Sequence, residues 1–206
     1  MRIVLWSVVF SSILLCFWAE VATPIVQRKH KDPERQLPVH VTLYLEKSVA
    51  ENETQYVAQA AMEWYEATNG QVIFDMVPLP AKDIDITKSV VILNVTPDEP
   101  NVIVLDTFND SSTLGYCDRN AALPNIDLVY SRINNDEATA VIMHELGHYL
   151  GLEHPNTKEH PEWGIGTLMY SSISYGSSHI TQEDLVRFCD IYHCDASKLH
   201  GFSQVQ

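Results

Sequence analysis

Three histidines and one glutamate occur at a spacing that suits a bound metal ion. Residues 144–154 read HELGHYLGLEH, so His144 and His148 are four positions apart. On a helix, positions i and i+4 share a face, and two neutral imidazole nitrogens can reach one ion from there. Glu145 lies beside them and can accept and donate protons. The pattern predicts a metal centre with a proton acceptor next to it.

A third ligand is expected from beyond the end of that helix. His154 follows His148 by six positions, and at about 100° per residue a continued helix would turn it away from the other two. Gly151 has no Cβ, so it can adopt a positive φ, end the helix and reverse the chain. We therefore expect His154 to return toward the same ion.

The pattern HExxHxxGxxH resembles the metzincin clan of zinc endopeptidases, in which a methionine-containing turn follows the third histidine. Residues 167–170 (TLMY) fit that turn, and the two motifs together are most similar to the matrixin, or matrix metalloprotease, group. The resemblance implies one catalytic zinc ion, Zn2+, bound by His144, His148 and His154. It also implies that Glu145 acts as general base on a zinc-activated water and then protonates the departing amine.

Three departures from the matrixin pattern accompany this resemblance. Met169 follows His154 by fifteen positions, which is more than matrixins usually show, so residues 155–166 are interpreted as an insertion whose Trp163 packs near the cleft. The histidine and aspartate pattern of the matrixin structural zinc site is missing, as is a cysteine-switch sequence. We therefore predict one zinc ion and no latency of the cysteine-switch type.

The pattern of apolar residues predicts an α+β fold. Residues 39–46 alternate strictly between apolar and other residues, which indicates a strand with one buried face. Helical spacing follows over residues 52–68, and Asn69-Gly70 provides a stop. Short apolar runs predict further strands at 71–77, 89–95, 101–108, 113–117 and 126–133.

Two more helices complete the expected domain. Asn134 and Glu137 form a capping-box-like start to the metal-binding helix, and the final helix is expected at 182–193. The order of elements resembles that of metzincins. It implies that residues 38–206 form a metzincin-type catalytic domain with a twisted, mostly parallel sheet, a long helix, a zinc-binding helix, a methionine turn and a C-terminal helix. Residues 113–117 (TLGYC) align by order with the matrixin edge strand, which pairs with extended substrate.

The N-terminal residues have the composition of a targeting segment. Arg2 precedes an apolar run at 3–18 that is broken only by serines, and residues 1–22 are interpreted as a secretory signal peptide. An uncleaved membrane anchor is the rival interpretation, although the run is short of the roughly 20 residues that a spanning helix needs. Residues 23–37, rich in charge and proline, are interpreted as a linker or short pro-segment. If the signal peptide is removed, the mature protein is expected to be secreted, extracellular or periplasmic, and to have no stable membrane association.

The amino-acid composition limits the kinds of partner that the protein is expected to bind. A formal charge of −14 over 206 residues argues against nucleic acid and against electrostatic attachment to anionic lipid. We expect a monomer that acts on protein or peptide substrates. Ca2+ has weak support: Asp106, Asp110 and Asp118 could bind it, but a solvated acidic loop is the favoured interpretation.

Three cysteines follow the expected signal peptide. Cys117, Cys189 and Cys194 predict one disulfide and one free thiol in an oxidising compartment, with the pairing left open.

A rival function comes from a different class, a metzincin-fold module that binds zinc and peptide without cleaving it. The presence of Glu145 argues against this alternative, because a module that does not turn over needs no proton acceptor beside the metal.

Overall fold

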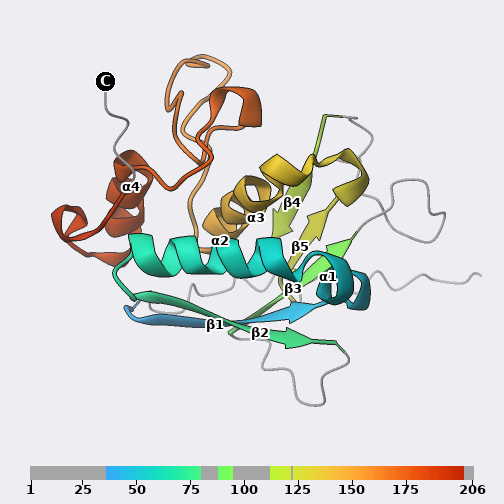
Figure 1. Cartoon of the computed structure of the whole chain (residues 1–206). Coiled ribbons are helices and arrows are strands. Elements are labelled where there is room, and N and C mark those ends of the chain that lie inside the picture. Colours follow the sequence, from blue (N-terminus) through green and yellow to red (C-terminus); the bar gives the residue numbers. More distant parts are fainter. Residues whose placement is uncertain (1–35, 80–87, 95–111, 122, 202–206) are drawn as a thin grey trace, which may run out of the picture. The chain divides into compact units, whose positions relative to one another are not determined.

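A computed structural model of the chain describes residues 36–79, 88–94, 112–121 and 123–201 (Figure 1). All of them belong to one compact unit, Asp32–Gln206. The expected signal peptide and most of the expected linker lie outside the described residues, as does the expected strand at 101–108, so these remain predictions. Among the described helices, none combines the length and apolar character needed to cross a bilayer.

The described strands form one mostly parallel sheet, as predicted, and it has five strands. The spatial order is β2-β1-β3-β5-β4. The bounds are β1 (Val39–Leu45), β2 (Val72–Pro78), β3 (Ser89–Asn94), β4 (Gly115–Asp118) and β5 (Asn125–Leu128). The first four strands in this order run parallel, and β4 pairs antiparallel with β5. Among the described strands, β4 therefore lies at one edge of the sheet. It includes Gly115, Tyr116 and Cys117 of the segment 113–117 that was expected to be the edge strand.

The helix expected at 52–68 is present as one helix, α2 (Thr54–Ala67), and a short helix that was not expected precedes it. Helix α1 (Lys47–Asn52) is separated from α2 by Glu53, which has φ −117° and ψ 1°. Thr54 Oγ1 donates to the carbonyl of Ala50 at 2.6 Å, which ties the two helices together across this break. Helix α2 lies across the sheet (Figure 1) and ends as predicted, with positive φ at Asn69 and Gly70.

Helix α3 (Asn135–Tyr149) packs against α2 and β4. Trp64 in α2 is fully buried and its indole N–H donates to the carbonyl of Met143 in α3 at 3.0 Å. The predicted capping box at the start of α3 is wrong, because the Asn134 amide donates to the Glu137 carboxylate at 3.1 Å and caps no backbone N–H. A capping box occurs instead at α4 (Gln182–Tyr192), between Thr181 and Asp184.

The strand predicted at 126–133 is shorter than expected. It ends at Leu128, and a 3-10 turn, Tyr130–Arg132, replaces the remainder. The backbone N–H of Val129 still bonds to Leu114 of the neighbouring chain segment, but the N–H of Arg132 turns back to the carbonyl of Val129. This turn leads into α3 and so sets where the helix that carries His144 and His148 begins.

Candidate metal centre

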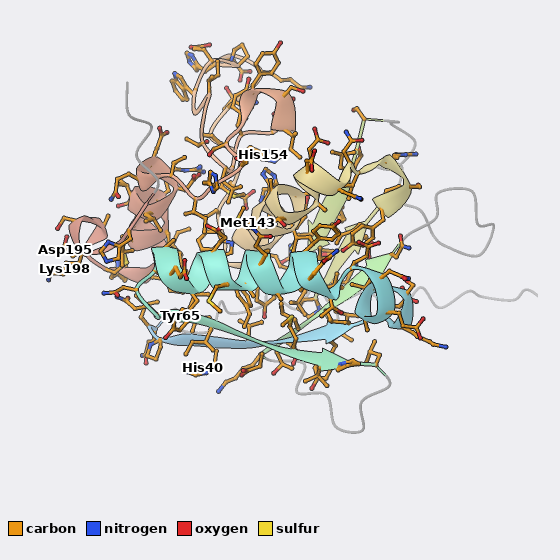
Figure 2. All side chains as sticks on the ribbon, viewed as in Figure 1. His40, Tyr65, Met143, His154, Asp195 and Lys198 are labelled. Carbon is orange, nitrogen blue, oxygen red and sulfur yellow. A yellow bond between two sulfur atoms is a disulfide. The ribbon has the colours of Figure 1, made fainter. Side chains whose placement is uncertain are left out.

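The end of α3 brings the three histidines together as the sequence predicts. Gly151 has φ +102°, and the N–H groups of Gly151 and Leu152 close the helix onto the carbonyls of His148 and Gly147. Leu152 is buried, so the chain turns back over the end of the helix. His154 then lies above α3, as Figure 2 shows.

The three imidazoles meet at their Nε2 atoms. Nε2 of His154 lies 3.1 Å from Nε2 of His144 and 3.1 Å from Nε2 of His148. On their other sides, Nδ1 of His144 is 2.8 Å from the carbonyl oxygen of Leu168, and Nδ1 of His148 is 2.8 Å from that of Leu152. A carbonyl oxygen can only accept, so both Nδ1 atoms must carry the hydrogen. Each Nε2 then presents a lone pair to the common centre.

This arrangement fits a zinc ion. Ligand nitrogens at about 2.0–2.1 Å from zinc in a tetrahedron lie roughly 3.3 Å from one another, close to the spacing found here. Nε2 of His154 can donate a hydrogen to only one of its two neighbours, so without a cation at least one of the lone pairs on His144 and His148 would have no partner in this cluster. Three neutral imidazoles with one coordination position left open are a typical catalytic zinc set.

Burial keeps these imidazoles neutral. Desolvation, reinforced by the neighbouring His148, lowers the pKa of His144 to about 3. The same two causes lower the pKa of His154 to about 4, and desolvation lowers the pKa of His148. Neutral imidazole is the form that binds metal.

Glu145 lies on α3 next to this centre and is 5% exposed. Burial, followed by the charge of Asp127, raises the pKa of its carboxyl to about 8. Its Oε2 has no hydrogen-bond partner among the described residues. A buried oxygen without a partner is costly, so this carboxyl is poised to receive a proton or a bound molecule.

Gly115 in β4 makes room for this carboxyl, a role that no pattern in the sequence assigns to it. A Cβ at this position would lie 2.7 Å from Oε1 of Glu145 and 2.9 Å from its Cγ. An isolated glycine inside a predicted strand is the signal that could have indicated such a close approach.

Met169 lies beneath the helix that carries the histidines. It is fully buried, and a Cβ on Gly147 of α3 would collide with its Sδ. The backbone N–H groups of Leu168 and Met169 donate to the carboxylate of Asp184 at 2.9 and 3.2 Å. This buried carboxylate fixes the turn whose Leu168 carbonyl orients His144.

A cleft of about 920 Å³ runs past the histidines. Its lining includes residues 112–120 on one side, His144, Glu145 and His148 from α3, and residues 170–174 on the other. Trp163 is not part of this lining. It is half exposed and stacks on His160 with ring centroids 4.0 Å apart, so the expectation that it packs near the cleft is not met.

The cysteine pairing left open by the sequence is Cys189 with Cys194, within and just beyond α4. Cys117 is the free thiol and lines the cleft. Burial and the neighbouring Glu145 raise its pKa, so it remains a thiol rather than a nucleophilic thiolate. Of the acidic cluster considered for calcium, Asp106 and Asp110 lie outside the described residues, while Asp118 accepts a bond from the N–H of Asn120.

No protein-family model matches the chain, and no curated protein matches it. Among solved structures, it is similar to metalloproteinase-II from Bacteroides fragilis, with a TM-score of 0.44, 14% identity and 76% of this chain covered. It covers 54% of that protein, about half of its length. A zinc-dependent peptidase from Methanocorpusculum labreanum (strain Z) matches with a TM-score of 0.37 and 14% identity over 72% of this chain and 99% of the peptidase. Likeness of this degree assigns the chain to no family, and the chemistry of the site follows from its own residues.

Proposed function

We propose that this chain is a secreted, matrixin-like zinc endopeptidase. In this proposal His144, His148 and His154 bind the ion and Glu145 is the general base. The observation that carries the proposal is the convergence of three Nε2 atoms, 3.1 Å apart along two sides, beside a buried carboxyl with an unpartnered oxygen. If these polar groups had only a structural role, they would form hydrogen bonds with other groups of the protein. Here they face a cleft instead.

Zinc bound at this site would act as a Lewis acid on a scissile carbonyl and lower the pKa of water to about 7. The chain supplies the proton chemistry. Glu145 would take the proton from the attacking water and hand it to the departing amine, acting first as base and then as acid. Burial raises the pKa of this carboxyl toward the range in which one group can both accept and release a proton near neutral pH.

The walls of the cleft suit an extended peptide. Among the described strands, β4 pairs only with β5, which leaves its other edge beside the cleft. An extended substrate can add to such an edge through backbone hydrogen bonds, whatever its side chains. Residues 170–174 also line the cleft. We propose that they form a wall of the pocket that receives the side chain after the scissile bond.

The experiment that tests this function compares the purified protein with Glu145→Gln. The substitution keeps the size of the side chain and removes its basicity. We expect one equivalent of zinc in both proteins, and peptide cleavage that falls by about 10²- to 10⁴-fold in the variant, the usual contribution of a positioned base.

Two results would contradict parts of the proposal. Wild-type cleavage by Glu145→Gln would exclude this residue as the base. Stoichiometric zinc in a wild-type protein that cleaves no member of a mixed peptide library would favour the non-catalytic binding module instead. Secretion is tested separately, by N-terminal sequencing of the exported protein for cleavage near residue 22.

A further inference from the structure

His154 is held differently from the other two histidines. His144 and His148 each have Nδ1 fixed by a backbone carbonyl at 2.8 Å. In the part of the chain that the structure describes, His154 has no such bond from Nδ1, and its side chain is the most exposed of the three. Outer hydrogen bonds normally fix the orientation of histidine ligands. The position of His154 must therefore come from the backbone that precedes it.

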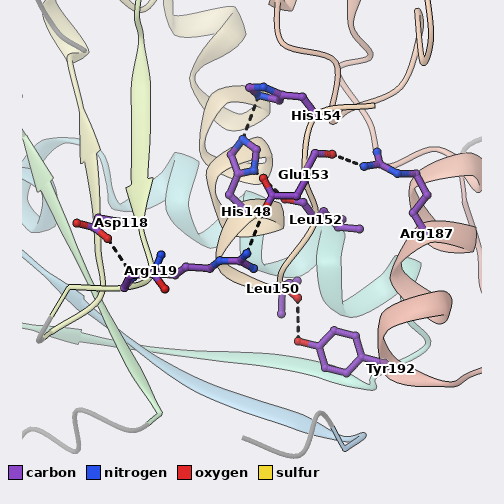
Figure 3. A network of polar contacts seen from close by, with 10 residues as sticks. Asp118, Arg119, His148, Leu150, Leu152, Glu153, His154, Arg187 and Tyr192 are labelled. Carbon is purple, nitrogen blue, oxygen red and sulfur yellow. Dashed lines mark hydrogen bonds and ion pairs between the residues drawn. The ribbon is translucent and has the colours of Figure 1, made fainter. Parts of the chain in front are cut away.

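That backbone is held by two arginines from different elements. Arg119, which directly follows β4, donates from Nη2 to the Glu153 carboxylate at 2.8 Å. Arg187 in α4 donates from Nη2 to the backbone carbonyl of Glu153. Figure 3 shows the two guanidinium groups reaching Glu153 from opposite sides, with His154 next to it in the chain.

The exposure of these groups indicates that the contacts do little for overall stability. The Glu153 side chain is 70% exposed and that of Arg119 is 33% exposed, and ion pairs of this kind contribute little to folding. Yet the Nη1 atoms of Arg119 and Arg187 are both buried and have no partner among the described residues. Both guanidinium groups are thus held against the protein at some cost, which favours a role in placing Glu153.

We propose that Arg119 and Arg187 act as positioning residues that hold Glu153 and so place His154 for zinc. This inference rests on the proposed function and adds to it a device that orders the third ligand before the ion arrives. Pre-ordering a ligand raises affinity because less conformational freedom is lost on binding. The device predicts weaker binding and faster release of zinc when either contact to Glu153 is removed.

The charges alone predict the opposite effect for the arginines. A guanidinium group repels a dication, so removing one without any loss of positioning would strengthen zinc binding. The sign of the change in Arg119→Ala therefore separates positioning from simple electrostatics. Glu153→Ala does not separate them, because both effects weaken binding, but it completes a double-mutant cycle with Arg119→Ala.

The experiment measures zinc affinity by competition with a chromogenic chelator, and zinc release by transfer to excess chelator. The purified proteins are the wild type, Arg119→Ala, Arg187→Ala, Glu153→Ala, the double variant of Arg119→Ala with Glu153→Ala, and Lys198→Ala. The last one breaks a distant surface pair of Lys198 with Asp195, 3.3 Å long, and serves as the matched control. We expect the single variants at Arg119, Arg187 and Glu153 to bind zinc about 10- to 100-fold more weakly, as for other outer-shell changes. The double variant should bind zinc no more weakly than the weaker-binding of its two single variants. Unchanged or tighter zinc binding by Arg187→Ala would overturn the role given to Arg187.

The melting temperature of each metal-free protein checks the fold. If Arg119→Ala melts well below Lys198→Ala, the deciding variant is Arg119→Lys, which keeps the cation and loses the planar fork; weaker zinc binding is again expected. Unchanged or tighter zinc binding by these Arg119 variants would overturn the inference and leave the proposed function intact. A wild-type protein that binds no zinc would instead overturn the proposed function, and this inference with it.

Discussion

Gly115→Ala should impair cleavage without removing the metal. The added Cβ would lie 2.7 Å from Oε1 of Glu145, 2.9 Å from Cγ and 3.0 Å from Cδ. Carbon atoms in contact prefer about 3.5–4.0 Å, so the Glu145 side chain must move by roughly 0.5–1 Å. It is buried against β4 and lines the cleft, so a movement away from the added Cβ displaces the carboxyl itself.

The effect on activity should exceed the effect on stability. A misplacement of about 1 Å in a reacting group can cost about 100-fold, so we expect kcat/KM to fall about 10- to 100-fold. Overpacking costs about 1–3 kcal/mol, while replacing glycine by alanine within a strand recovers about 0.5–1 kcal/mol. The net loss of stability should therefore be about 0–2.5 kcal/mol, which leaves the protein folded.

The assay for Gly115→Ala uses the peptide that the wild type cleaves best, with zinc content and urea denaturation measured on the same samples. The double variant Gly115→Ala/Glu145→Ala is the control for the contact, because truncation at Cβ removes all three colliding atoms of Glu145. In that background Gly115→Ala should cost no stability relative to Glu145→Ala alone. Wild-type kcat/KM in zinc-loaded Gly115→Ala would refute both the close contact and the role given to Glu145.

Three further predictions concern the parts of the fold around the site. Asp184→Asn should lower the free energy of unfolding by about 1–3 kcal/mol in urea denaturation. The carboxylate of Asp184 accepts four hydrogen bonds, whereas an amide has one acceptor oxygen, so the variant leaves a buried N–H unpaired. As a control, Asp190→Asn at an exposed position of the same helix should change stability by less than about 0.5 kcal/mol. Cys189→Ala should cost about 2 kcal/mol by loop closure, a loss that reduction of the wild type should reproduce and that an unchanged urea midpoint would contradict. Chelation should abolish cleavage and lower the melting temperature, and zinc restored at about 100 times its Kd should recover about 2.7 kcal/mol; equal recovery with magnesium would exclude a nitrogen-rich zinc site.

The parts of the site that the sequence predicts are those that depend on local geometry. Helical spacing places His144 and His148 on one face, and a glycine that ends the helix turns the chain back toward His154. The sheet is also predictable, because period-two alternation and short apolar runs are local patterns. Where local rules compete, prediction fails: Asn134 bonds to the Glu137 side chain instead of capping the helix, and the short helix α1 before Glu53 was not expected.

The parts that the sequence does not predict are contacts between elements far apart in the chain. Gly115 meets Glu145 across 30 positions, and Arg119 meets Glu153 across 34. Such pairs depend on how β4 packs against α3 and on where the chain goes after Gly151. Neither distance follows from periodicity or motif spacing. Glycines within short strands and arginines just after them are common in proteins, so only the packed structure gives these two residues a role.

The energetics of the site favour a function over a structural role. The protein buries the Glu145 carboxyl with one oxygen unpartnered and turns the Nε2 atoms of three neutral imidazoles toward one another. Either arrangement costs stability on its own, because buried polar groups are normally paired. A single cation at the centre of the imidazoles, with water beside the carboxyl, would satisfy both at once. Groups that are costly alone and satisfied together by one ion are best explained by retention for the chemistry of that ion.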